Sequence, residues 1–167
     1  MEEKIPETKR TNKLLLLVVI LLSGFSCSSE NVYDDYKMIN RKGWHKDSTL
    51  VFNFDIKDTL SSYDLFLNIR NYSDYYFRNI WLDINIVTPD GQAEKEFHEI
   101  ILADHLGNWH GSGIGDLCDL QVAYQSDILF PVPGNYQVSI KHKMKEPVLE
   151  GVRDMGFSVK KSYSGKK

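Results

Sequence analysis

Apolar and polar residues alternate along much of the chain beyond Trp44. The alternation is clearest in four segments, at residues 50–56, 65–70, 80–86 and 136–141. Neighbouring side chains of a β-strand point to opposite faces, so a period of two predicts strands with one face on a core. A less regular apolar pattern predicts three further strands, at residues 97–102, 128–130 and 157–159.

Turn signals separate several of these predicted strands. Pro89-Asp90-Gly91 and Pro133-Gly134-Asn135 combine the fixed φ of proline with residues that tolerate a left-handed backbone. No stretch between residues 44 and 167 has a sustained helical period. Seven to eight short strands joined by turns predict an all-β domain. We expect an antiparallel β-sandwich, either immunoglobulin-like or jelly-roll-like.

The first 26 residues have a different pattern. Lys9, Arg10 and Lys13 precede an unbroken apolar run at residues 14–22. Nine helical residues span about 13 Å, whereas the hydrocarbon core of a bilayer is about 30 Å thick. A basic start, a short apolar run and small residues before a cleavage point are typical of a secretory signal peptide.

Cys27 directly follows this segment and indicates a lipoprotein. A small residue before a cysteine is the pattern of a bacterial lipobox, in which the thiol takes a diacylglyceryl group and the freed amine takes an acyl chain such as palmitate. At about 0.8 kcal/mol per buried CH₂, several acyl chains give firm anchoring. Gly24 stands where leucine is usual, as in the relaxed lipoboxes that this segment resembles in Bacteroidota. The alternative is an ordinary signal peptide that is cut near Ser26.

These patterns divide the chain into four parts. We expect a signal peptide at residues 1–26, the lipidated cysteine and a polar tether at 27–43, the β-sandwich at 44–161 and a flexible tail at 162–167. Within the tether, the spacing of Tyr33, Tyr36 and Ile39 is compatible with a short helical face.

Charge and cysteine content narrow the function classes. Without the signal peptide the chain keeps 16 basic and 20 acidic residues, a net charge of −4. Nucleic-acid partners normally need a basic surface, so we expect none. If Cys27 carries lipid, Cys118 has no partner for an intramolecular disulfide, and the apolar core must hold the fold.

The segment with the most distinctive composition is residues 103–119, which we call the Gly/Trp loop. Four glycines surround Trp109, and large aromatic residues in structured loops often anchor protein contacts. The equally weighted alternative is that Trp109 folds back and caps the sandwich. The candidate protein-contact residues are Asp104, Gly107, Trp109, Gly111, Gly113, Gly115 and Asp116.

Metal and phosphate sites in this loop are not expected. Seven residues in the loop or just before it have side chains that could bind a metal: His98, Asp104, His105, His110, Asp116, Cys118 and Asp119. They lack the paired spacings, such as C-x₂-C or H-x₃-H, that mark structural zinc sites. The run Gly-Ser-Gly-Ile-Gly lacks the Lys-Ser/Thr of a phosphate loop, and Asp116 would repel a phosphate. We therefore expect no metal and no cofactor.

Enzymatic signals are equally weak. Neither G-x-S-x-G nor H-E-x-x-H occurs, and Glu94, Glu96 and Glu99 have no second carboxyl group in a contrasting environment. We expect no enzyme and no small-molecule substrate. Tyr75, Tyr76 and Trp81 offer an alternative as a stacking platform for sugars, although aromatic residues of this kind more often pack on a sheet.

Further short motifs accompany the Gly/Trp loop along the chain: Trp44 before residues 50–54, Tyr63-Asp64-Leu65, Ile69-Arg70-Asn71, Asn79-Ile80, Leu102-Ala103-Asp104, Gly134-Asn135-Tyr136, Leu149-Glu150-Gly151-Val152 and Asp154-Met155-Gly156. Taken in order, these features resemble the GldH family of gliding-motility lipoproteins of Bacteroidota. The resemblance covers nearly all of the chain after Cys27, and the Gly/Trp loop is its most specific part.

The resemblance implies a non-enzymatic, lipid-anchored protein of the cell envelope. It implies a structural or protein-binding part in gliding motility and type IX secretion, with other envelope proteins of that apparatus as partners. We expect the outer rather than the inner membrane. The alternative is a glycan-binding surface lipoprotein of a carbohydrate-uptake system.

Overall fold

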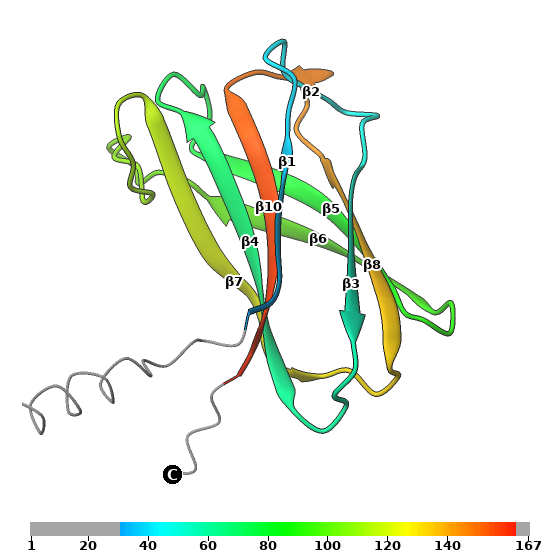
Figure 1. Cartoon of the computed structure of the whole chain (residues 1–167). Coiled ribbons are helices and arrows are strands. Elements are labelled where there is room, and N and C mark those ends of the chain that lie inside the picture. Colours follow the sequence, from blue (N-terminus) through cyan, green and yellow to red (C-terminus); the bar gives the residue numbers. More distant parts are fainter. Residues whose placement is uncertain (1–30, 163–167) are drawn as a thin grey trace, which may run out of the picture.

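Ten β-strands form the regular structure of residues 31–162, the part of the chain that the computed structural model describes (Figure 1). They are β1 (Asn31–Met38), β2 (Trp44–His45), β3 (Leu50–Ile56), β4 (Ser62–Tyr72), β5 (Asn79–Val87), β6 (Ala93–Ile101), β7 (Leu117–Leu129), β8 (Gly134–His142), β9 (Val148–Leu149) and β10 (Val152–Lys161). Over these residues the predicted all-β class is confirmed, and none of them lies in a helix long and apolar enough to cross a membrane.

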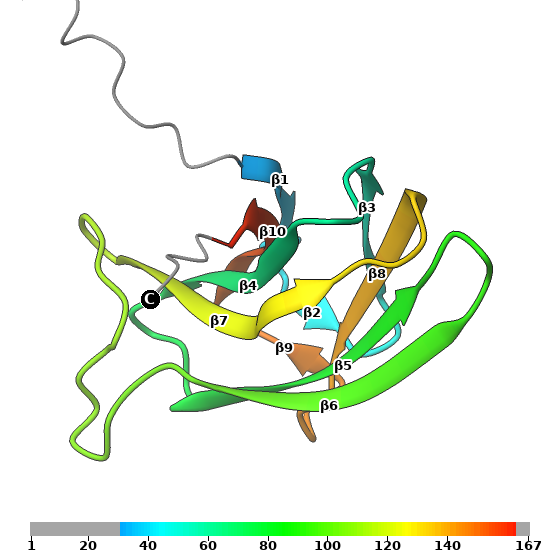
Figure 2. The same ribbon diagram turned by 90° about the horizontal axis from the view of Figure 1, so that it is seen from below.

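Two four-stranded antiparallel sheets pack face to face (Figure 2). The first has the order β1-β10-β4-β7 and the second the order β3-β8-β5-β6, while β2 and β9 form a separate short pair. Without that pair, the first of the eight long strands is bonded to the last, the second to the seventh, the third to the sixth and the fourth to the fifth. Successive pairs alternate between the sheets, which is the path of a jelly roll.

The core lies between the two sheets and is rich in aromatic rings. Phe54 of β3 is at its centre, with ring centroids 5.7 Å from Phe130, 5.6 Å from Tyr136 and 5.9 Å from Phe157. In β3 the buried and exposed residues alternate as the period of two predicts. The alternation therefore identified the inward face of this strand correctly.

The prediction that residues 27–43 are a tether and that the sandwich begins at Trp44 is wrong for residues 31–38. They form β1, which pairs with β10 along its whole length. Tyr33 packs on Phe54, with ring centroids 5.8 Å apart, and Ser158 donates a hydrogen bond of 2.8 Å to Asp34. The spacing of three between Tyr33 and Tyr36 had suggested a helical face. In a strand, side chains an odd number of residues apart point to opposite faces, so the two rings lie on different faces of β1.

Ser162, the last residue that the structure describes, is hydrogen-bonded to the sandwich. Ser162 was expected to begin the flexible tail. Its backbone N–H donates a hydrogen bond of 2.9 Å to the carbonyl of Ser62, and its hydroxyl donates one of 2.7 Å to Asp64. The prediction for the signal peptide, for Cys27 and for residues 163–167 falls outside the described residues.

Tyr36 covers the outer face of the first sheet where β10 has a glycine. A Cβ atom on Gly156 would lie 2.8 Å from Cδ1 and 2.9 Å from Cε1 of Tyr36. The guanidinium of Arg70 lies 4.3 Å from the centroid of the same ring and donates a hydrogen bond of 2.7 Å to Asp119. Gly156 thus leaves the space in which the Tyr36 ring lies flat on the sheet.

We expect Gly156→Ala to lower the free energy of unfolding by about 1–3 kcal/mol, because the new methyl group overpacks the contact with Tyr36. Urea unfolding of the variant and of the wild-type chain measures this difference. In a Tyr36→Ala background the same glycine substitution should cost clearly less. An equal cost in both backgrounds would show that the ring contact does not require the glycine.

Candidate functional site

Four connections meet at one end of the sandwich, and the ends of the described chain lie at the other (Figure 1). The connections are residues 39–43, 73–78, 102–116 and 143–151. β1 begins near the end of the sandwich where the described residues start and finish, and it runs toward the connections over about 23 Å for eight strand residues. The connections therefore lie at the opposite end of the sandwich from Asn31.

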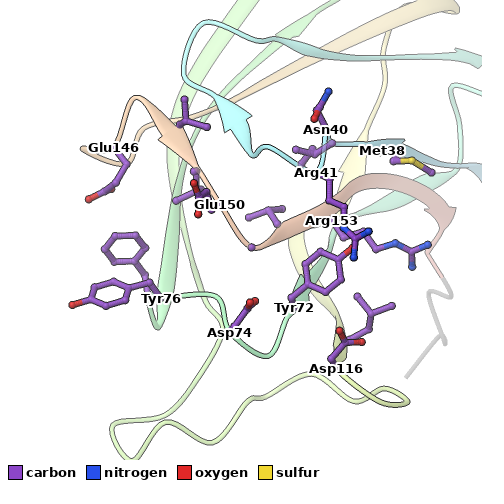
Figure 3. Close-up of a pocket in the computed structure, with 17 residues that line it drawn as sticks. Met38, Asn40, Arg41, Tyr72, Asp74, Tyr76, Asp116, Glu146, Glu150 and Arg153 are labelled. Atoms are coloured by element: carbon purple, nitrogen blue, oxygen red, sulfur yellow. The ribbon is translucent and has the colours of Figure 1, made fainter.

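A groove with a volume of about 1080 Å³ opens at the end formed by these connections (Figure 3). Each of the four contributes to its walls: Ile39, Asn40 and Arg41 from the first, Asp74, Tyr76 and Phe77 from the second, Asp116 from the third, and Glu146 with residues 148–151 from the last. Backbone hydrogen bonds hold the walls together. The N–H of Ser73 donates to the carbonyl of Asp116 at 2.7 Å, and the N–H of Tyr72 donates to that of Gly151 at 2.8 Å.

The groove is lined by more carboxylates than cations. Its acidic residues are Asp74, Asp116, Glu146 and Glu150, and its basic residues are Arg41 and Arg153. Arg153 lies 3.7 Å from the carboxylate of Asp154, which is not among the lining residues. Within residues 31–162, none of the four lining carboxylates forms an ion pair. Four carboxylates and two guanidinium groups therefore give the lining a net charge of −2.

Glu146 is placed beside a group of aromatic rings. Its Oε2 atom is buried and has no hydrogen-bond partner. Burial raises the pKa of the nearby Tyr75 hydroxyl, and the Glu146 carboxylate raises that pKa further. Tyr75 contacts Phe77 edge to face at 5.9 Å, and Phe77 contacts Tyr76 in the same way at 5.1 Å. Tyr76 is 89% exposed and lies at the same end of the groove as Glu146 (Figure 3).

The Gly/Trp loop lies next to this groove and is largely held by its own hydrogen bonds. Asp104 accepts hydrogen bonds from the N–H groups of Leu106 and Asn108 at 2.8 and 2.9 Å, and Gly107 has a φ of 87°. Trp109 packs against the core, with its ring centroid 6.4 Å from that of Tyr75. The structure thus supports the capping interpretation of Trp109.

The second half of the loop approaches β7 closely. A Cβ atom on Gly113 would lie 1.9 Å from the carbonyl oxygen of Leu117, and one on Gly111 would lie 2.8 Å from that of Asp119. These two glycines are therefore needed for packing. Residues 117–119, which we expected to be part of the loop, belong to β7. The most exposed apolar side chains of the loop are Leu106 and Ile114, which the sequence did not single out.

Of the seven candidate contact residues, only Asp116 lines the groove. The acidic residues 74, 146 and 150 were missed because they are spread over different connections and none belongs to a local motif. Tyr75 cannot serve in the sugar-stacking platform that we considered with Tyr76 and Trp81. Its side chain is only 4% exposed, and its hydroxyl donates a hydrogen bond of 3.0 Å to the carbonyl of Asn79. No group of three or more potential metal ligands comes together within residues 31–162.

His142, the last residue of β8, is buried, with its ring centroid 5.4 Å from that of Trp44. Neither ring nitrogen has a hydrogen-bond partner of normal geometry. Burial lowers the pKa of His142, and the nearby His45 lowers it as well, while the backbone of Trp44 and the carboxylate of Glu146 act in the opposite direction. The folded state therefore favours the neutral ring.

We expect the free energy of unfolding to fall as the pH falls below about 6.5, where His142 binds a proton in the unfolded but not in the folded chain. The loss is at most about 1.4 kcal/mol per pH unit. His142→Leu should flatten urea-derived stability between pH 5 and about 7, and His105→Leu on the exposed loop should not. An unchanged slope in the His142 variant would assign the pH dependence to other groups.

Comparisons with known proteins agree on one family. The model of the GldH lipoprotein family matches residues 31–159. A gliding motility lipoprotein GldH homolog from Christiangramia forsetii is 36% identical over 156 residues, which cover 89% of this chain and 94% of that protein. The gliding motility lipoprotein GldH of Flavobacterium johnsoniae is 34% identical over 157 residues, or 90% of this chain and 96% of that one.

Solved structures resemble the chain only weakly. The 4-O-methyl-α-glucuronidase BtGH115A aligns with 81% of this chain and 18% of its own, with a TM-score of 0.39 and 8% identity. A likeness of this size has no bearing on the function.

Proposed function

The chain belongs to the GldH lipoprotein family, and we propose that it is a non-enzymatic component of the gliding motility and type IX secretion apparatus that binds another envelope protein. Its relatives are gliding motility lipoproteins, so the chain is a lipid-anchored lipoprotein of the cell envelope. The observation that carries the binding role is the acidic groove at the end of the sandwich farthest from Asn31.

We propose that Cys27 is the lipidated residue and that its lipid anchors the protein in the outer membrane. Four Cα–Cα steps separate Cys27 from Asn31, and each spans at most about 3.5 Å. The start of β1 then lies within about 14 Å of the lipid-bearing residue. A sandwich held this closely at one end presents its other end, with the groove, away from the membrane surface. This geometry supports a role in contacting a partner protein rather than the bilayer.

Deletion of the gene in a strain that glides should abolish colony spreading and reduce secretion of type IX substrates. A plasmid copy of the wild-type gene should restore both. A Cys27→Ala copy should restore neither, and its product should leave the membrane fraction, because the acyl chains that hold it are missing. Fractionation and spreading assays on the same cultures measure these outcomes.

Cys118→Ala is the matched control, since it removes the other cysteine of the chain. We expect it to restore spreading and to remain in the membrane fraction. Normal spreading and normal secretion after deletion of the gene would contradict the proposed function. Membrane retention of the Cys27→Ala product would contradict the assignment of the lipid to Cys27.

A further inference from the structure

We infer that the groove binds an extended, positively charged segment of a partner protein, with a lysine or arginine side chain placed against Glu146 and Tyr76. The inference rests on the proposed function and names the chemistry of the partner. It is carried by the shape of the groove, its uncompensated charge and the surroundings of Glu146.

The walls of the groove suit a peptide. Small-molecule sites usually occupy about 300–1,000 Å³ and enclose most of their ligand, so this groove is at the upper limit of their size and is open rather than enclosed. This groove has a volume of about 1080 Å³, and all four connections at this end of the sandwich contribute to its walls. Its lining combines apolar side chains, such as Val148 and Leu117, with the charged side chains of Glu146, Glu150 and Asp116. Such a lining fits a segment of several residues.

The charge of the groove selects a cationic occupant. The lining contains four carboxylates and two guanidinium groups. No lining carboxylate forms an ion pair within the described residues. A phosphate-bearing ligand, such as an anionic lipid headgroup, would be repelled by this lining. Complementary charge instead speeds the encounter with a basic segment and fixes its register.

Glu146 is the residue with most to gain from a cation. One of its oxygens is buried and receives no hydrogen bond. Withdrawing an ionised carboxylate from water without a donor is unfavourable, and a cation at the carboxylate offsets that cost. Exposed Tyr76 lies at the same end of the groove, and the face of an aromatic ring also attracts an ammonium or guanidinium group. Carboxylate and ring together therefore favour a lysine or arginine side chain.

Site-specific photocross-linking in living cells tests the inference with the full lipoprotein. Tyr76 is replaced by p-benzoylphenylalanine, a substitution that its 89% exposure should tolerate. The same replacement at Leu60, 92% exposed in the connection between β3 and β4, serves as the control at the opposite end. We expect an adduct at position 76 that is absent at position 60. Mass spectrometry should map it to a segment of another envelope protein with a net positive charge.

Glu146→Gln should reduce the yield of this adduct at least about fivefold, whereas Glu94→Gln on β6 should leave it unchanged. A synthetic peptide of the mapped segment should bind the detergent-solubilised lipoprotein, as measured by fluorescence anisotropy. Its Kd should rise about tenfold with Glu146→Gln and should also rise with salt. The thermal melts of both variants verify that they are folded.

Three outcomes of the cross-linking would overturn the inference: no specific adduct at position 76, an adduct only with lipid or with a second copy of this chain, or a mapped segment without positive charge. Equal Kd values of the peptide for the wild type and for Glu146→Gln would also overturn it. If deletion of the gene stops gliding while any of these occurs, the proposed function stands and the groove has another role. If deletion leaves gliding and secretion normal, the proposed function fails whatever the peptide does.

Discussion

A chain that starts at Gly43 is expected not to fold, whereas a chain that starts at Asn31 is expected to fold normally. The shorter chain lacks β1, which pairs with β10 along its full length. It also loses the Tyr33 ring from the aromatic core and the Tyr36 ring that covers Gly156. Several hydrogen bonds at about 1 kcal/mol each, together with these two partly buried rings, approach the total stability of about 5–15 kcal/mol of a typical domain.

Circular dichroism and amide NMR spectra of the two purified chains measure this effect. The chain from Asn31 should give a dispersed spectrum and a cooperative melt, and the chain from Gly43 should give neither. If residues 31–38 were a tether, as the polar sequence suggests, the two chains would have equal stability. Equal urea midpoints would therefore contradict the structural role of β1.

Truncation of Phe54 should cause a large loss of stability, about 3–5 kcal/mol for Phe54→Ala. Phe54 is 3% exposed, and its ring contacts those of Tyr33, Tyr136 and Phe157 from the two sheets and that of Phe130, which follows β7. The substitution removes the buried ring and leaves a cavity that these neighbours cannot fill without moving. Urea unfolding followed by tryptophan fluorescence measures the difference.

Phe97→Ala is the matched control for Phe54→Ala. Phe97 is also in a strand, β6, but is 62% exposed. Its removal should change the free energy of unfolding by no more than about 0.5 kcal/mol. A loss at Phe54 no larger than that at Phe97 would mean that Phe54 is not central to the core.

The prediction of strands was correct where one face of the strand is buried and the other is exposed to solvent. Residues 50–56 were predicted from strict alternation and form β3 with the same bounds. β1 was missed because polar Asp34 and Asp35 interrupt the pattern and its two tyrosines lie on opposite faces. The choice between immunoglobulin-like and jelly-roll topology depends on which distant strands pair, for example β1 with β10, and local periodicity contains no such information.

The candidate site shows the same limit. The Gly/Trp loop was found because its unusual residues are consecutive, and its place beside the groove agrees with a functional end of the sandwich. The groove itself was not predicted, because Asp74, Asp116, Glu146 and Glu150 are scattered over nearly 80 residues of sequence. Only the pairing of strands brings their connections together.

The position of β10 has a consequence for how the protein reaches its folded state. β10 contains the last strand residues of the described chain, yet it lies inside the first sheet between β1 and β4. The first sheet cannot close until residues 152–161 are available, and contacts of such high sequence separation form slowly. A chain must be unfolded to be exported as an extended segment across a membrane, and a first sheet that waits for residues 152–161 stays open until they have been synthesised.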